Sequence, residues 1–258
     1  MKTKLRKNFF RTGVLGIFLL FSTIQGPAKV ASSKKEATNS SGLDINDAPP
    51  IGLNKNVASF VNHYLKQYHL ALVVAKKRSG TIFPVIDSVF SLYDLPVELK
   101  YLAVVESYLA TNVKSQSGAA GIWQLMPASA KILGLNKASG NDERLQISKS
   151  SAAAAKYLKQ LYDEFGDWLL AIAAYNAGSR RIHRAIKQAG SSDFWLLQNY
   201  LPAETRNHVK RFIGVHYFFE GQGSIATLTK KETDRYMRQV AELADGNSGS
   251  KTESNKGS

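Results

Sequence analysis

The chain has 258 residues, no cysteine and a formal net charge of +14 at pH 7. Without cysteine, the mature protein is expected to have neither disulfides nor a lipid-bearing cysteine. Residues 1–31 carry six of the lysines and arginines and no acidic residue, so the remainder still has a charge of +8. Such a basic surface suits nucleic acid, anionic lipid or an acidic polymer, or serves solubility alone, and charge does not separate these roles.

The N-terminal segment has the pattern of an export signal. Basic residues precede an apolar run from Val14 to Ile24, which is typical of a secretory signal peptide and short for a membrane span. Gly26 and Ala28 supply small residues for a cleavage site, although cleavage itself stays open. We therefore expect residues 1–31 to be a signal peptide and the protein to be exported, which argues against nucleic acid as its partner.

A linker and a helical extension are expected next. Residues 32–52 are small and polar and end in prolines, which is typical of a flexible linker. Order is predicted to begin near Asn54. Apolar residues at four-residue intervals predict a helix with one apolar face, which is more typical of a core than of a sugar platform. These residues are Phe60, Tyr64, Tyr68 and Leu72.

A second helix is predicted to open at Pro84, because Ser79-Gly80 interrupts the pattern before it. Together the two helices define an N-terminal helical extension over residues 53–94, braced against the core.

The segment from Leu95 to Pro127 places one carboxylate in apolar surroundings. Pro96 fits the first turn of a helix, and residues 101–105 are apolar on every face, so this helix is expected to be buried. Glu106 falls near the C-terminal end, where burial and the negative end of the helix both favour the protonated carboxyl group. This is the setting of a general acid. Periodicity alone would favour a solvated glutamate, or a buried one that a basic residue satisfies for structural reasons.

Further helices are predicted towards the C-terminus. Pro127 opens a short helix that ends at Gly134, and residues 136–149 are expected to form a polar loop. Ser150 is predicted to cap an alanine-rich helix that closes at Gly166, and Asp167 to cap the next helix, which ends at Gly178. Tyr175 lies at the end of that helix, where a core ring with a satisfied hydroxyl is the competing interpretation.

The last helices are predicted from their first turns. One is expected from Ala203 to Phe219, with Glu204 favourably placed near its positive end. Thr229 and Glu232 have capping-box spacing, so a final helix is predicted over residues 230–244. We therefore divide the C-terminal part into a helical segment over residues 223–244, which includes this helix, and a disordered tail over residues 245–258.

Three motif blocks occur in order along the chain. They are Glu106-Ser107 with Ser115 and GAAGIWQLMP at 118–127, then AAYNAG at 173–178, then PAETR at 202–206. Together they resemble the signature of the lytic transglycosylase SLT domain, in which the glutamate of an E-S pair is the catalytic acid/base. With the extension that precedes LPVEL, the chain resembles the membrane-bound lytic transglycosylase D type more than the other branches of the family.

The resemblance implies a mainly α, lysozyme-like catalytic domain over residues 95–222, with room for a small hairpin. It implies that Glu106 protonates the β-1,4 bond between N-acetylmuramic acid and N-acetylglucosamine, and that the C6 hydroxyl then closes a 1,6-anhydro end. The partner is then peptidoglycan glycan strands in the periplasm or cell envelope, with no cofactor and no metal. The substrate-binding residues would be Ser115, Gln124, Met126, Tyr175 and Glu204.

Two features depart from the family pattern. His208 stands where the pattern P-x-E-T-x-x-Y has tyrosine, and no LysM-like repeat follows the third block. A peripheral contact with the membrane or wall therefore stays open, as does the oligomeric state.

Two other functions remain as alternatives. A muramidase-type hydrolase would need a second positioned carboxylate, for which Glu204 is the motif-embedded candidate. A non-catalytic peptidoglycan-binding protein would tolerate loss of the acid, and the intact Glu106-Ser107 pair argues against it.

Overall fold

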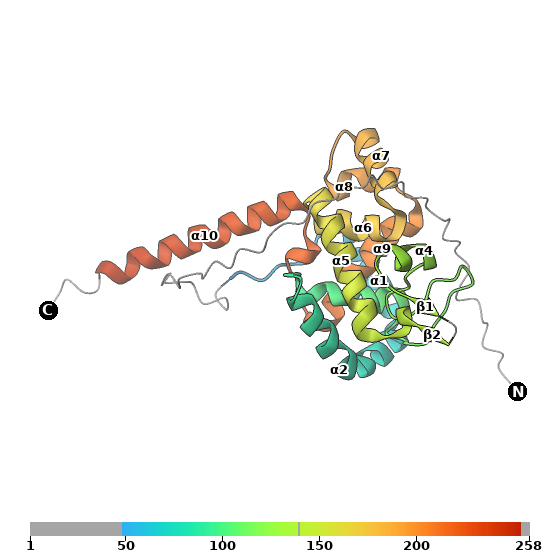
Figure 1. Ribbon diagram of the computed structural model, residues 1–258. Coiled ribbons are helices and arrows are strands. Elements are labelled where there is room, and N and C mark those ends of the chain that lie inside the picture. Colours follow the sequence, from blue (N-terminus) through green and yellow to red (C-terminus); the bar gives the residue numbers. More distant parts are fainter. Residues whose placement is uncertain (1–47, 139, 254–258) are drawn as a thin grey trace, which may run out of the picture. The chain divides into compact units, whose positions relative to one another are not determined.

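The computed structural model describes residues 48–138 and 140–253 (Figure 1). The predicted signal peptide and most of the predicted linker lie outside these residues. Residues 50–235 form one compact unit, and residues from Tyr236 onward belong to a second. The described elements are almost all helices, as predicted.

Helix α1 (Lys55–Gln67) begins where order was predicted to begin. The side chain of Asn54 accepts a hydrogen bond from the backbone N–H of Asn56 and so caps the helix. Val61 and Tyr64 are buried, and Phe60 packs against the core at its edge. The aromatic stripe is therefore core, as predicted.

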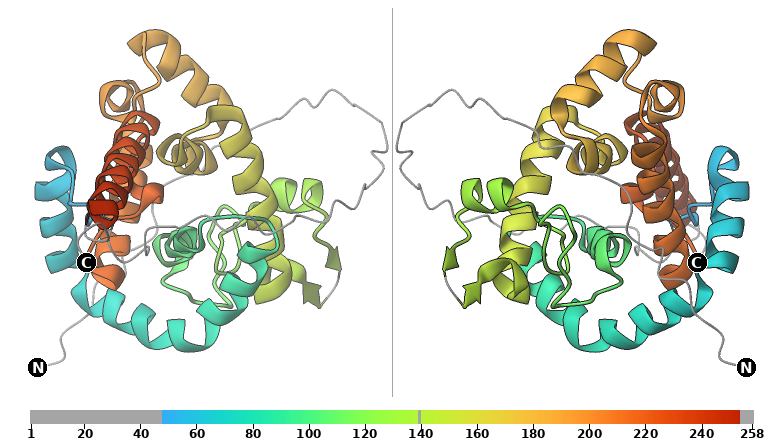
Figure 2. Two further views of the ribbon diagram at one scale, coloured as in Figure 1. Left: turned by 90° about the vertical axis from the view of Figure 1, so that its left-hand side faces the viewer. Right: turned by 90° about the vertical axis from the view of Figure 1, so that its right-hand side faces the viewer.

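Helix α2 (His69–Ser91) runs without interruption through Gly80 and Pro84, so the prediction of a separate helix opening at Pro84 is wrong. A proline inside a helix costs about 3 kcal/mol and a glycine about 1 kcal/mol. Each fully buried apolar side chain stabilises by about 1.5–3 kcal/mol, and α2 buries enough of them to outweigh both residues. They are Leu72, Ala75, Ile82, Ile86, Val89 and Phe90. The α2 ribbon bends along its length in Figure 2, as expected around an internal proline.

The buried helix predicted after Leu95 is present in two parts. A 3-10 turn, η2 (Val97–Lys100), follows Pro96 and leads directly into α3 (Tyr101–Ser107). Residues 101–104 are all buried. The short α3 therefore lies within the core and brings Glu106 out of it near the C-terminal end.

The next segment contains more structure than the predicted polar loop. After α4 (Pro127–Ile132), the strands β1 (Lys137–Ala138) and β2 (Asn141–Asp142) pair antiparallel as a small hairpin. A 3-10 turn, η3 (Glu143–Leu145), follows, and Arg144 in it is only 2% exposed. The prediction of a polar loop over 136–149 is wrong here, because this segment forms a hairpin and a 3-10 turn, and the side chains of Glu143 and Arg144 are buried and hydrogen-bonded within the protein.

Helices α5 (Ile147–Phe165), α6 (Trp168–Ala177) and α7 (Ser179–Ala189) follow. Gly166 and Asp167 end α5 and cap α6 as predicted. Ser150 does not cap α5, because its hydroxyl donates to the carbonyl of Gln146 from within the first turn. Helix α6 is buried along almost its whole length and packs against α5, α7 and α9, so it is the centre of the unit (Figure 1).

The C-terminal part contains α8 (Phe194–Leu197), η4 (Gln198–Tyr200), α9 (Ala203–Glu220), η5 (Ile225–Thr227) and α10 (Lys230–Glu253). The capping box is confirmed: the Thr229 N–H donates to the Glu232 carboxylate, and the Glu232 N–H donates to the Thr229 hydroxyl. The predicted end at residue 244 is wrong, because α10 continues to Glu253. Glycine and serine are poor helix formers, but extending an existing helix costs less than starting one.

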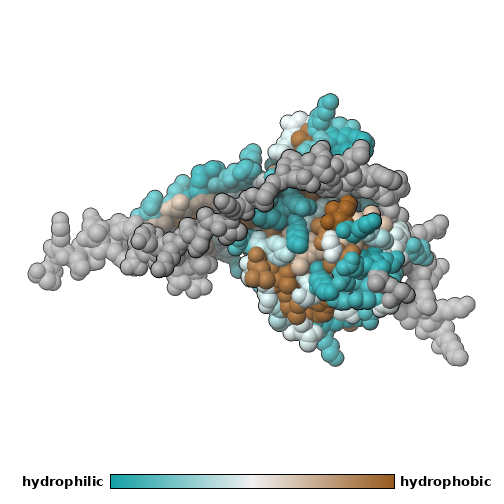
Figure 3. All heavy atoms as spheres, in the orientation of Figure 1, coloured by the Kyte–Doolittle hydropathy of each residue, from teal (hydrophilic) through white to brown (hydrophobic). Residues whose placement is uncertain are grey.

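On the face shown in Figure 3, hydrophilic and hydrophobic residues lie in alternating patches. Exposed apolar side chains on α2 include Leu70, Val73 and Val74, which lie away from the face that α2 buries. Within the described part of the chain, no helix has the length and hydropathy needed to cross a membrane.

Candidate active site

The C-terminal end of α3 holds Glu106 at the edge of the core. Its side chain is 16% exposed. Tyr108 and Leu109 follow in the left-handed region, with φ of 50° and 58°, and end the helix within two residues of the acid. Such backbone costs about 1–2 kcal/mol per residue, and Leu109 offsets it by being buried. The site is therefore built on a strained turn that the core holds in place.

The loop over residues 113–126 is tied to this helix end by Ser107. The buried Ser107 hydroxyl lies 3.2 Å from the Ala103 carbonyl and 3.0 Å from the Ile122 carbonyl, so it joins α3 to the loop. Ala120 and Leu125 exchange two backbone hydrogen bonds of 3.1 Å and close the loop on itself. The second residue of the E-S pair thus has a structural role: it fixes the loop beside the acid.

Gly121 is required by the path of this loop. Its φ is +75°, and a Cβ at this position would lie 1.9 Å from the Arg144 carbonyl oxygen. Only glycine fits so close an approach with that backbone conformation.

Arg144 clamps the same loop from the other side, and sequence reasoning missed it. Its Nη1 donates to the Gly118 carbonyl at 2.7 Å and to the Leu125 carbonyl at 2.9 Å. Its other nitrogens bind the Asp142 carboxylate, which lowers the pKa of Asp142 to about 2. Nothing in the sequence distinguished this arginine from a solvated one, since the groups it clamps in the loop are backbone carbonyls 19 and 26 residues away along the chain.

Trp123 and Tyr175 link the loop to α6. The Trp123 indole is fully buried, stacks on Phe90 and donates to the Ser151 hydroxyl at 2.9 Å. The Tyr175 hydroxyl donates to the Trp123 carbonyl at 2.8 Å. Burial, and after it the charge of Glu106, raise the pKa of Tyr175 well above its usual value. Tyr175 therefore keeps its proton and lies near the acid, although its hydroxyl is committed to the backbone.

Helix α9 supplies a partner of Glu106 that was not predicted as a site residue. His208 Nε2 lies 2.9 Å from Glu106 Oε1, and the His208 side chain is only 5% exposed. The sequence marked His208 only as a departure from the family tyrosine. The structure thus gives Glu106 a histidine as hydrogen-bonding partner, and this contact is compatible both with a catalytic acid and with a carboxylate paired for structural reasons.

The first turn of α9 is fixed by the second motif block. The Thr205 hydroxyl donates to Asn176 Oδ1 at 2.9 Å and joins α9 to the end of α6. Glu204 precedes His208 by four residues, so the two side chains lie on one face of α9. The third motif block therefore contacts the second, and the second contacts the loop of the first through the hydrogen bond from Tyr175 to the Trp123 carbonyl.

The remaining predicted site residues shape the loop. The Ser115 hydroxyl accepts from the Ala119 N–H at 3.0 Å, and the Gln124 amide donates to the Gly121 carbonyl at 2.8 Å. Gln124 adopts a left-handed φ of 46°. Met126 is partly exposed and lies at the N-cap position of α4. The Ser115 and Gln124 side chains therefore stabilise the loop through its own backbone.

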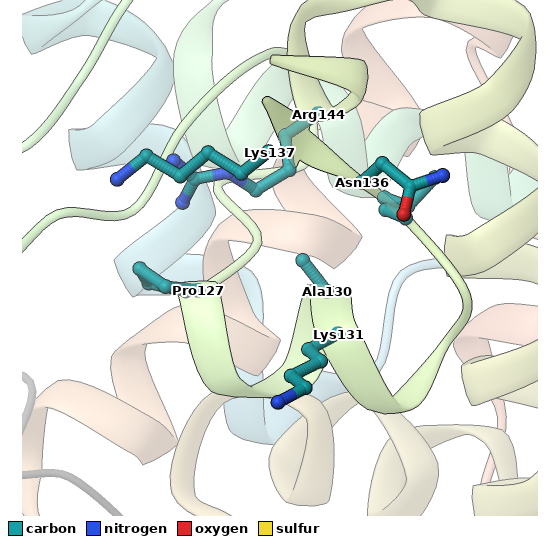
Figure 4. Close-up of a pocket in the computed structure, with 7 residues that line it drawn as sticks. Pro127, Ala130, Lys131, Asn136, Lys137 and Arg144 are labelled. Carbon is teal, nitrogen blue, oxygen red and sulfur yellow. The ribbon is translucent and has the colours of Figure 1, made fainter. Parts of the chain in front are cut away.

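A pocket of about 290 Å³ lies beside α4, and Figure 4 shows the side chains around it. Pro127 and Arg144 join it to the loop, and Lys131 and Lys137 add positive charge. None of the predicted site residues lines it. Across the residues with described structure, no three His, Asp or Glu side chains are grouped to hold a metal ion.

Comparison with known proteins agrees with this geometry. Residues 92–198 match the family model of the Transglycosylase SLT domain, which confirms the resemblance; the match contains the first two motif blocks and ends before the third. The membrane-bound lytic murein transglycosylase D of Escherichia coli (strain K12) is 38% identical over 127 residues, covering 47% of this chain and 28% of that protein. A putative tributyltin chloride resistance protein of Alteromonas sp. (strain M-1) is 34% identical over 118 residues, covering 45% of this chain and 57% of the relative.

A solved structure supports the fold. The 70-kDa soluble lytic transglycosylase in complex with bulgecin A superposes with a TM-score of 0.50 at 22% identity, covering 68% of this chain and 32% of that one. The predicted mainly helical, lysozyme-like fold is therefore confirmed. The chain spans between about a quarter and somewhat over half of the two curated relatives, so the similarity concerns the domain around Glu106.

Proposed function

We propose that the protein is a lytic transglycosylase that cleaves the β-1,4 bond between N-acetylmuramic acid and N-acetylglucosamine in peptidoglycan and leaves 1,6-anhydromuramic ends. The observation that carries this proposal is the setting of Glu106. It is a largely buried carboxylate at the end of α3, held beside the loop of the SLT signature and contacted from α9.

Glu106 would act twice on the substrate. Its protonated oxygen gives a proton to the glycosidic oxygen as the bond to C1 breaks, and the N-acetyl carbonyl of the substrate stabilises the cation at C1. The Glu106 carboxylate then takes the proton of the C6 hydroxyl, which bonds to C1. No water is consumed. Such general acid/base catalysis typically contributes about 10²–10⁴ in rate.

The other residues would bind and orient the glycan. Ser115 and Gln124 offer hydroxyl and amide groups to the sugars, and Met126 an apolar wall. Tyr175 lies near the acid, and Glu204 lies on the face of α9 that carries His208. Ser115 and Gln124 would thus have two roles. Each holds the loop through a hydrogen bond to its backbone, and each would also contact the glycan.

The hydrolase remains the second candidate because Glu204, on the face of α9 that carries His208, is the motif-embedded carboxylate that could serve as its second acidic group. A water-using enzyme would need such a base or nucleophile, whereas the transglycosylase needs only Glu106.

The test compares Glu106→Gln with Glu204→Gln, both nearly isosteric. Glu106→Gln should abolish the release of muropeptides from purified peptidoglycan, while thermal melting shows an intact fold. Glu204→Gln should lose about 10-fold to 100-fold, through a misplaced contact and not a missing reagent. Equal inactivation by both substitutions would favour the hydrolase, and substantial activity in folded Glu106→Gln would refute the acid.

The same proposal covers organisation and location. We assign catalysis to residues 95–222, a bracing role to 53–94 and a signal peptide to 1–31, with the protein exported to the periplasm or cell envelope. The basic charge fits a polymer whose stem peptides carry carboxylates.

A further inference from the structure

His208 meets the acid from a helix that packs directly against α3. Helices α3 and α9 are neighbours in the core, and the Nε2 to Oε1 distance between His208 and Glu106 is 2.9 Å. Among the hydrogen bonds described, it is the one that engages the Glu106 carboxyl group. Oε1 is therefore occupied, and Oε2 is the oxygen left for a ligand.

The surroundings of the imidazole indicate where its proton lies. His208 Nδ1 is buried and has no hydrogen-bond partner in the described part of the protein. A proton on Nδ1 would bury an unpaired donor, which is costly. With the proton on Nε2, the ring donates to Oε1 and only a lone pair of Nδ1 is unpaired.

We propose that His208 is a positioning residue for Glu106: its Nε2–H holds Oε1 in place and directs Oε2 to the substrate. This inference rests on the proposed function and adds a residue to it. Oε1 accepts the same hydrogen bond whether Oε2 carries a proton or not. The His208 proton therefore stays in place while the Glu106 proton moves to the glycosidic oxygen and is replaced by that of the C6 hydroxyl.

The hydrogen bond also favours the first proton transfer. A donor binds a carboxylate more strongly than the carbonyl oxygen of a carboxylic acid, because the bond becomes charge-assisted. The hydrogen bond from His208 therefore strengthens as Glu106 loses its proton. An interaction that is stronger in the transition state than in the bound substrate complex lowers the barrier to proton transfer.

Neighbouring groups keep His208 available for this role. The Tyr175 hydroxyl, which lies near Glu106, donates to the Trp123 carbonyl and does not compete for Oε1. The bond from Thr205 to Asn176 anchors the turn of α9 that precedes His208. Val209 and Phe212, which follow on the helix, are fully buried.

Three variants test the proposal. His208→Phe keeps a ring but removes the donor, and kcat on soluble glycan strands should fall about 10-fold to 100-fold with KM little changed. His208→Gln places an amide N–H near the position of Nε2 and should restore kcat to within about 5-fold of the unmutated protein. The matched control is His216→Gln, another buried histidine on α9, which bonds to the Ser224 hydroxyl and should leave kcat unchanged.

Unchanged kcat in folded His208→Phe would overturn the proposal. So would an equal loss in His208→Phe and His208→Gln, because the hydrogen bond would then not be what matters.

A measurement on the unmutated protein does not depend on activity. NMR of the imidazole nitrogens at pH 7 should find the proton of His208 on Nε2, and Glu106→Ala should shift this resonance. A proton on Nδ1 would contradict the proposal even if His208→Phe fails to fold. If the unmutated protein releases no muropeptide while His208 has the expected tautomer and contact, the proposed function fails and the contact stands.

Discussion

The position of the Glu106 carboxylate depends on the strained turn that ends α3 and on the loop over residues 113–126. Ser107 reaches the Ile122 carbonyl, and the left-handed residues Tyr108 and Leu109 turn the chain away directly after it. A glutamate earlier in α3 would lie inside the core, and one after the turn would lose the contact from His208. The position of Glu106 is thus set by the helix end as much as by its own side chain.

Gly121→Ala is expected to destabilise the protein far more than Gly134→Ala. Both glycines have φ between 75° and 82°, so each alanine meets a similar backbone strain of about 1–2 kcal/mol. Only at Gly121 would the new Cβ collide with a backbone oxygen, that of Arg144, whereas nothing lies within 4 Å at Gly134. Gly121→Ala should therefore lower the free energy of unfolding by about 1–3 kcal/mol more than Gly134→Ala does, as measured by urea unfolding. Equal losses would show that the loop relaxes freely.

Helix α9 joins the acid to the C-terminal part of the unit. Its first turns carry Glu204 and His208, and eight residues after His208 it carries His216, which is 1% exposed and bonds to Ser224. Burial lowers the pKa of His216 to about 4.

Acid should therefore destabilise the protein through His216. In the unfolded chain this histidine takes up a proton near pH 6.5, but in the folded protein it does so only near pH 4. Protons favour unfolding in that window, so the free energy of unfolding falls as the pH drops from 6.5 to 4. The contribution should reach about 3 kcal/mol at the acidic end, since one pKa unit corresponds to about 1.4 kcal/mol.

His216→Gln should remove this part of the pH dependence. Urea unfolding of both proteins at several pH values measures it, and the unmutated protein should lose its advantage over the variant as the pH falls. Parallel stability curves for the two proteins would contradict the assignment.

The elements differ in how far the sequence could predict them. Residues that cap or end a helix act locally, so the helix end at Gly166 and the cap at Asp167 were predicted correctly. Helix α2 was divided wrongly at Pro84, because the burial that keeps it intact depends on contacts with distant segments such as α5.

The sequence predicted the site residues that belong to a motif. It did not predict those that reach the site only through the packing of distant helices. Glu106 and its loop are contiguous in sequence and fall in a recognisable pattern. His208 lies 102 residues from Glu106, and which face of α9 meets α3 is decided only by the packed core. Arg144 was missed for the same reason, since it binds backbone carbonyls that no side-chain pattern reveals.

At the scale of the whole molecule, the N-terminal extension and the segment of the SLT signature form one compact unit. Helix α1 packs against α9 and α2 against α5, so the extension supports the helices that surround the acid. The family match begins at residue 92 and leaves all of α1 and α2 outside it. These helices are nevertheless part of the core that positions His208 and Glu204.

The central claim is that a hydroxyl of the sugar, and not water, attacks C1 after Glu106 has protonated the bond. The direct measurement is a digestion of purified peptidoglycan in water labelled with heavy oxygen, followed by mass analysis of the released muropeptides. The new ends should be 1,6-anhydro, lighter by one water than hydrolysed ends and free of label. Reducing ends that carry heavy oxygen, or no release by the folded protein, would contradict the proposed function.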